Sequence, residues 1–138
     1  MRSLSFSLLF GICLGVVSVE SQVFIDQTEI SGMASAGLYS TGGSWGDFDN
    51  DGRLDLYVTH WGTATSDPTN ALYHNVGEES FVNVARSAGV DVLGNSSGST
   101  FADYDNDGYL DLYVADFFDQ DRLYNNNRDG TFTEVGRA

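Results

Sequence analysis

An acidic stretch of nine residues occurs twice in this chain, at 47–55 and again at 103–111. The copies read Asp-Phe-Asp-Asn-Asp-Gly-Arg-Leu-Asp and Asp-Tyr-Asp-Asn-Asp-Gly-Tyr-Leu-Asp, with carboxylates at positions 1, 3, 5 and 9 of each. Two like charges ~4 Å apart repel by about 1 kcal/mol in water, and by several times that in a partly dry site. A folded chain tolerates such a cluster when a divalent cation lies between the carboxylates. The alternative is a pair of solvated acidic turns, because Asp, Asn and Gly favour turns.

Calcium fits this pattern better than magnesium, because it takes 6–8 oxygen ligands in loose geometry whereas magnesium requires a strict octahedron. Alternation at positions 1, 3 and 5 directs every second side chain inward. Glycine at position 6 permits the sharp turn that brings the backbone carbonyl of position 7 to the ion. Recurrence in one register favours metal binding over solvated turns. We therefore predict two Ca²⁺ sites, with ligands from Asp47, Asp49, Asp51, Arg53 and Asp55, and from Asp103, Asp105, Asp107, Tyr109 and Asp111.

The residues that end each acidic stretch predict a strand, because apolar residues alternate with other residues at a period of two in 54–58 and 110–114. A helix–loop–helix calcium hand expects Glu at loop position 12, where this chain has Val58 and Val114. Both observations exclude the helical calcium hand.

The chain after residue 22 divides into two repeats of about 24–80 and 81–138. Each repeat predicts about four short strands: one that enters the acidic loop, one that leaves it, and a hairpin through 72–81 or 123–132. Turn residues at Asn75–Glu79 and Asn126–Gly130 favour the hairpins. Four strands per unit are typical of a propeller blade. The predicted fold is all-β, with about two four-stranded blades of an incomplete β-propeller.

The net charge is −14 at pH 7, and all six basic residues are arginine. This charge argues against nucleic acid as a partner, which requires basic patches, and against anionic membrane surfaces. The single cysteine, Cys13, excludes an intrachain disulfide and thiol-based zinc or redox sites.

Residues 1–21 read as a secretory signal peptide. Arg2 supplies the positive start, Leu4–Val19 is an apolar run broken only by three serines, and Ser21 offers a small residue before Gln22. An uncleaved anchor is the alternative, but about 16 residues are few against the ~20 that a spanning helix needs. We expect a secreted protein, or a periplasmic or cell-surface one in a bacterium, with no membrane span in the mature chain.

The two repeats resemble the FG-GAP/VCBS repeats of integrin-alpha-type β-propellers. The resemblance rests on Phe24-Ile25-Asp26 followed by Gly32, on the two D-x-D-x-D-G-x-x-D-L-Y-V runs, and on Leu-Tyr-x-Asn followed by Phe. It covers residues 23–138 and is strongest to the secreted branch that includes cartilage acidic protein. It implies that the four carboxylates of each loop bind one calcium ion, which braces the loop between two strands of a blade.

Propellers of this family use about seven blades, so two repeats cannot close a ring. We expect the chain to be the N-terminal part of a larger protein, a fragmentary gene model, or a chain that must oligomerise. The expected function is calcium-braced binding or adhesion to an extracellular protein or glycan, without enzymatic activity. The alternatives are a part of a propeller-type extracellular enzyme, such as a polysaccharide lyase or lipase, and a truncated non-functional fragment.

Three other features of the sequence have a functional interpretation. The run 42–46 satisfies G-x-S-x-G around Ser44, but a nucleophile elbow needs a helix after the serine, and a loop and strand are predicted there. Asn95 begins a glycosylation sequon, which is usable in a eukaryote. His60 and His74 lack zinc-type spacing and are expected to be surface or packing residues.

Two further clusters have competing interpretations. Asp116, Asp119 and Asp121 are expected to form a solvated loop rather than the acidic rim of a site, because this stretch lacks the glycine turn. Four aromatic residues are expected to pack between blades rather than to form a sugar-stacking platform, and these are Trp45, Tyr57, Phe101 and Tyr113.

Overall fold

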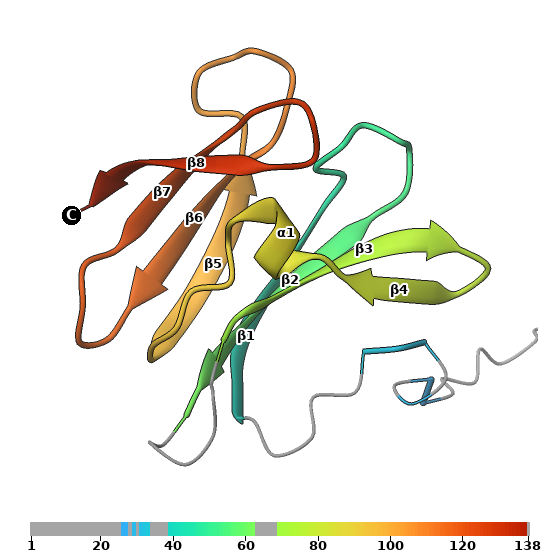
Figure 1. Cartoon of the computed structure of the whole chain (residues 1–138), viewed down its shortest axis with the longest axis horizontal. Coiled ribbons are helices and arrows are strands. Elements are labelled where there is room, and N and C mark those ends of the chain that lie inside the picture. The colour runs from blue at the N-terminus through green and yellow to red at the C-terminus, as the bar shows by residue number, and fades with distance from the viewer. Residues whose placement is uncertain (1–25, 28, 30, 34–38, 63–68, 138) are drawn as a thin grey trace, which may run out of the picture.

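The computed structural model describes residues 26–27, 29, 31–33, 39–62 and 69–137. The predicted signal peptide and Cys13 lie outside the described residues. Within them, the chain forms two four-stranded antiparallel sheets in which each strand pairs with its neighbour in sequence (Figure 1). This confirms the prediction of an all-β fold with four strands in each of two units.

The first sheet contains β1 (Tyr39–Gly46), β2 (Asp55–Trp61), β3 (Ala71–Gly77) and β4 (Ser80–Asn83). The second contains β5 (Ser96–Ala102), β6 (Asp111–Asp116), β7 (Arg122–Asn126) and β8 (Phe132–Arg137). The connection between the sheets includes one short helix, α1 (Ala85–Ala88). No helix in the described part of the chain is long and apolar enough to span a membrane.

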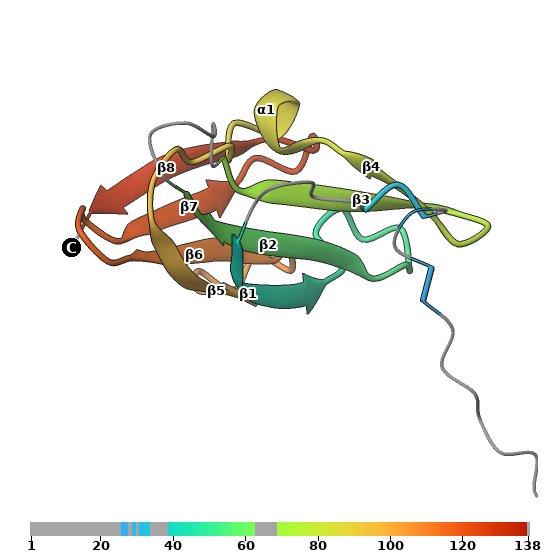
Figure 2. The same ribbon diagram turned by 90° about the horizontal axis from the view of Figure 1, so that it is seen from below.

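The two sheets pack side by side in the manner of neighbouring propeller blades. Strands β1 and β5 adjoin at one edge of the pair, and β4 and β8 lie at the opposite edge (Figure 2). The β1–β5 contact is hydrogen-bonded, because Thr41 Oγ1 donates to Ser96 O at 2.6 Å and the Ser44 and Ser99 hydroxyls lie 2.9 Å apart. Helix α1 lies between β4 and β8, and its two buried alanines join the core.

A single hydrophobic core joins the sheets. The first sheet and its loop contribute Phe48, Tyr57 and Leu72, and the second contributes residues that include Leu112 and Val114. Tyr57 is fully buried, and its hydroxyl donates to Val90 O at 2.8 Å in the connection between the sheets. The core therefore lies between the blades rather than within either one.

Corresponding residues of the two repeats differ in burial, because each sheet has only one neighbour. Tyr57 is 0 % exposed and its counterpart Tyr113 is 36 % exposed; Phe48 is 3 % exposed and its counterpart Tyr104 is 48 % exposed. The opposite faces show the reverse, since Leu112 is fully buried while its counterpart Leu56 is only partly buried. The face of the first sheet that carries Tyr57 is thus covered by the second sheet, whereas the corresponding face of the second sheet, which carries Tyr113, is open.

This asymmetry corrects one prediction from the sequence. Tyr57 and Phe101 do pack in or against the core between the sheets. Trp45 is 55 % exposed and contacts Phe81 with a ring separation of 6.3 Å, and Tyr113 faces outward. The expectation that all four aromatic residues pack between blades was therefore wrong for Trp45 and Tyr113, which lie on the two open faces.

The sheets are out of phase with the sequence repeats. They span 39–83 and 96–137, so β4 lies in the second sequence repeat but completes the first sheet. Ser31 O accepts a hydrogen bond from Phe81 N at 2.8 Å, which places the preceding segment against β4. Gly32 adjoins this contact at φ +82°, where a Cβ would lie 2.7 Å from Phe81 O. Only glycine fits such a close approach.

Candidate metal sites

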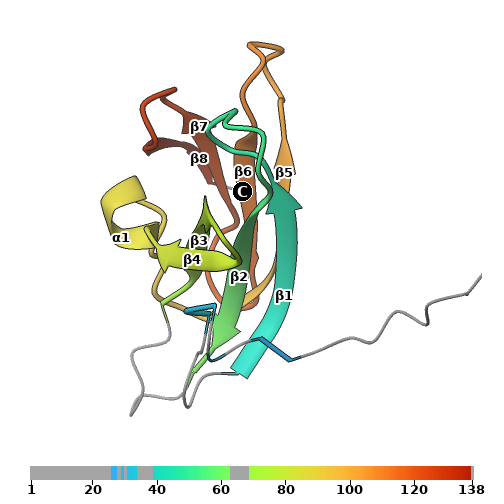
Figure 3. The same ribbon diagram turned by 90° about the vertical axis from the view of Figure 1, so that its right-hand side faces the viewer.

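The two acidic stretches form the β1–β2 and β5–β6 loops, at the same end of the two sheets (Figure 3). They also contact each other, because Asn50 Nδ2 donates to Gly108 O at 2.9 Å. Strands leave both loops as the sequence predicted, and no helix flanks either loop in the described residues. The exclusion of a helical calcium hand is confirmed.

The first carboxylate of each stretch organises its loop. Asp47 accepts from the backbone N–H groups of Asp51 at 3.0 Å and Gly52 at 2.9 Å. Asp103 does the same for Asp107 and Gly108, both at 3.0 Å. Carboxylates cap turns in this way, and Asn and Gly supply the left-handed conformations that the turns require. The loops therefore hold their shape through their own backbone contacts.

The carboxylate at position 9 of each stretch is buried at the start of the exit strand. Asp55 is fully buried and accepts from Phe48 N at 3.2 Å and Asn75 N at 2.8 Å. Burial raises the pKa of Asp55; the two backbone hydrogen bonds oppose this rise, and the nearby charge of Asp49 adds to it. A cation beside Asp55 would offset the cost of burying its charge.

Asp111 repeats this arrangement in the second loop. It is 1 % exposed and accepts from Tyr104 N at 3.1 Å and from Asn126 N at 2.8 Å. The two loops are therefore alike in backbone contacts as well as in sequence.

Three of the predicted ligands meet in each loop. One carboxylate oxygen from each of Asp47, Asp49 and Asp55 lies within 4.8 Å of the others, and the same holds for Asp103, Asp105 and Asp111. Each triad offers hard oxygen donors on a preformed turn, which suits a divalent cation. These two groups could each hold a metal ion.

The carboxylate at position 5 of each stretch lies outside these triads and faces a cation of the protein. Asp51 pairs with the Arg53 guanidinium, and Asp107 accepts from Arg128 Nη2 at 2.6 Å. Desolvation disfavours the charge of Asp51, but the Arg53 N–H, His74 and the Arg53 charge outweigh it and lower the pKa of Asp51. The Tyr109 N–H and Arg128 lower the pKa of Asp107.

The position-7 residues were predicted to act through their carbonyls, and that role stays a prediction. Their side chains contact the loop rim instead. The Arg53 guanidinium also donates from Nε to Asn75 O at 2.7 Å, and the Tyr109 ring lies under the Arg128 guanidinium, 5.8 Å from ring centre to Cζ.

The asparagine that ends each Leu-Tyr-x-Asn motif closes the site from the neighbouring strand, a role that was not predicted from the sequence. Asn75 Nδ2 donates to Leu54 O at 3.1 Å, and Asn126 Nδ2 donates to Leu110 O at 2.9 Å. The backbone N–H of each asparagine donates to the carboxylate at position 9. The recurrence of the motif just after each loop was the signal that could have revealed this role.

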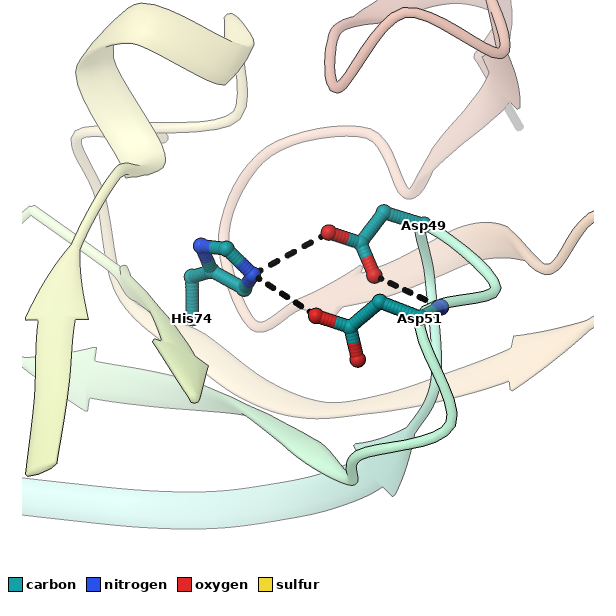
Figure 4. A group of neighbouring side chains, drawn as sticks. All are labelled: Asp49, Asp51 and His74. Atoms are coloured by element: carbon teal, nitrogen blue, oxygen red, sulfur yellow. Dashed lines mark hydrogen bonds and ion pairs between the residues drawn. The ribbon is translucent and has the colours of Figure 1, made fainter. Parts of the chain in front are cut away.

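The residue before that asparagine differs between the repeats. His74 Nε2 lies 3.0 Å from Asp49 Oδ2 and 3.4 Å from Asp51 Oδ2, and the three form another group that could hold a metal ion (Figure 4). The counterpart Asn125 donates from Nδ2 to Asp105 at 3.2 Å. His74 was expected to be a surface or packing residue. Its spacing from the other histidine could not reveal Asp49 and Asp51, which approach it from a loop more than twenty residues earlier in the chain.

The other sequence candidates have local roles. Ser44 lies within β1 rather than on a strand–helix turn, so the nucleophile elbow is excluded. Asp116 Oδ1 accepts from Phe118 N at 3.0 Å and Asp119 N at 2.9 Å, so it caps the turn after β6. Asp121 accepts from the Tyr113 hydroxyl, and this bond lowers the pKa of Asp121.

Two packed four-stranded blades, each with an acidic turn between its first two strands, define a propeller-type repeat protein with candidate metal loops. The FG-GAP-like repeat family matches residues 47–114 and 103–138. The chain belongs to this family. A search of curated proteins found no match.

Proposed function

We propose that this protein is a secreted, calcium-binding repeat module in which the ions are structural. The observation that carries the proposal is the pair of identical carboxylate triads, held in one register at the same end of two packed sheets. Calcium accepts such oxygen donors in flexible geometry, and extracellular modules bind it with Kd values of ~10⁻⁴–10⁻³ M. The ions would neutralise the loop carboxylates and brace the β1–β2 and β5–β6 hairpins.

Binding, rather than catalysis, is the proposed role of the loop end of the molecule. Its carboxylates are already engaged with backbone N–H groups, arginines and a histidine of the same protein. Calcium would fix the shape of these exposed turns, and an extracellular protein or glycan would contact that fixed surface. The apolar run at 4–19, ahead of repeats whose loops need calcium, supports a site of action outside the cell.

The proposal is tested by calorimetric titration of the full chain with calcium, together with thermal unfolding. Two sites are expected in the original protein, and one in each of Asp47→Asn and Asp103→Asn. At calcium tenfold above Kd, each site adds about 1.4 kcal/mol to the free energy of unfolding.

The matched control is Asp91→Asn, which removes a carboxylate that pairs with Arg86 away from the loops. It should keep both sites and the calcium-dependent stabilisation. Absence of binding heat and of any melting shift at millimolar calcium in the folded original protein would overturn the proposal.

A further inference from the structure

The two loops present different donor atoms to a metal. At the third residue of Leu-Tyr-x-Asn, β3 of the first sheet carries His74 and β7 of the second carries Asn125. His74 directs an imidazole nitrogen at two carboxylates, whereas Asn125 directs an amide at Asp105 and Asp111. The second loop is therefore lined by oxygen donors and an amide, and the first adds a nitrogen ligand.

The imidazole is held in place for this contact. Its ring meets the buried Phe48 ring edge-on, with centroids 5.8 Å apart and an interplanar angle of 76°. Phe48 is in turn packed against Phe132 of the second sheet, 5.8 Å between ring centres. The ring that carries Nε2 thus rests on the core between the sheets, and Figure 4 shows Nε2 facing Asp49 and Asp51.

The two loops differ in the kind of metal that their ligand atoms favour. Calcium prefers oxygen, whereas an imidazole nitrogen suits first-row transition metals, and zinc sites combine imidazole with carboxylate. We propose that Asp49, Asp51 and His74 give the first loop a second binding mode, for a divalent transition metal of the zinc class, which the second loop lacks because it carries no imidazole. The inference rests on the proposed function, that both loops are metal sites.

Two groups of the protein must yield to such an ion. His74 binds metal through an Nε2 that carries no proton, and Arg53, which pairs with Asp51, must release that carboxylate. The Arg53 side chain is 43 % exposed, so water can solvate the guanidinium once it leaves Asp51, and its Nε also donates to Asn75 O at 2.7 Å. Only one other histidine occurs in the chain, and His60 is 1 % exposed, so neither of its ring nitrogens is open to an ion from solvent.

The test is a zinc titration of the full chain, compared between the original protein and His74→Asn. Asparagine is the residue that β7 carries at this position, so the variant is expected to fold, which circular dichroism checks. The zinc affinity of the first loop should fall at least about tenfold, since even outer-shell partners of a metal contribute that much. In the original protein, zinc should shift the NMR signals of the His74 ring and not those of His60.

Equal zinc affinity of the original protein and His74→Asn would overturn the inference, as would unchanged His74 signals on zinc addition. A calcium titration of the same two proteins keeps this failure distinct from failure of the proposed function. Two calcium sites in His74→Asn with equal zinc affinity would reject only the transition-metal binding mode. Asp91→Asn, which alters an acidic residue outside the loops, should leave zinc affinity unchanged.

Discussion

Identical carboxylates have different tasks at different positions of the same nine-residue stretch. Asp47 caps the turn, Asp55 is buried against backbone N–H groups, and Asp51 faces cationic side chains. The acidic pattern predicted which residues gather, and the triads agree with it for positions 1, 3 and 9. It could not predict the cation opposite Asp107, because Arg128 reaches that carboxylate from 21 residues away.

The asparagines of the two hairpins give a matched pair for mutation. Asn126 is 2 % exposed and donates to Leu110 O and, across the sheets, to Phe48 O at 2.8 Å. Asn126→Ala should lower the free energy of unfolding by about 1–3 kcal/mol, because it leaves buried carbonyls without a donor.

Asn75→Ala removes a more exposed contact within one blade, and should cost only about 1 kcal/mol. Urea denaturation in the presence of a chelator measures both values without a contribution from metal. Equal losses would show that the bond between the sheets does not add to stability.

At the scale of elements, the strands next to the acidic loops were predictable because their period of two is strong. The hairpins were predicted as well, but the first turn is at Glu78–Glu79, where both residues have positive φ. These residues lie within the predicted turn region Asn75–Glu79, but glutamate gives no sequence signal for that conformation, so the pattern did not show that β3 continues to Gly77. Helix α1 was missed because it is one turn long and its N-cap residue is Val84, whose apolar side chain makes no capping hydrogen bond.

Gly89 ends α1 in the left-handed conformation, with φ +77°, and its N–H bonds Arg86 O at 3.3 Å. Gly89→Ala should destabilise the protein by about 1–2 kcal/mol, because an L-residue with a Cβ is strained there. The α1 segment covers the shared core, so the loss should appear in global unfolding.

Gly98 in β5 is the control, because it has no positive φ and an added Cβ would meet nothing within 4 Å. Gly98→Ala should be neutral or stabilise the protein by about 0.4–1 kcal/mol through the unfolded state. Thermal unfolding of both variants gives the comparison, and a similar loss in both would argue against strain at Gly89.

At the scale of the whole molecule, the alternation in 54–58 and 110–114 could not reveal which face of each sheet would be buried. The sequences of the two repeats are identical there, yet Tyr57 is enclosed and Tyr113 is exposed. The difference comes from the position of each sheet in the pair, which a local pattern does not encode. Net charge and motif spacing do not indicate the position of each sheet either.

The shared core predicts that damage in one sheet is felt in the other. Leu112→Ala should cost about 2–5 kcal/mol, because this side chain is fully buried between the sheets. Both tryptophans, Trp45 and Trp61, lie in the first sheet. Tryptophan fluorescence and circular dichroism should therefore report the same lowered midpoint for this second-sheet variant.

Leu56→Ala, the counterpart on an open face, should cost roughly half as much, in proportion to the apolar area it buries. A fluorescence midpoint that stays at its original value in Leu112→Ala would mean that the sheets unfold independently.

The open faces have a consequence for how stability scales with the number of blades. A row of n blades contains n − 1 interfaces, whereas a closed ring of n blades contains n, and the stability of such arrays is close to a sum of unit and interface contributions. The two sheets here share one interface, so each blade has half an interface to itself. Every blade added to an open face raises the average number of interfaces per blade towards one. The proposed ion in each loop would be counted once per blade at any length, and would therefore contribute its largest share in the shortest array.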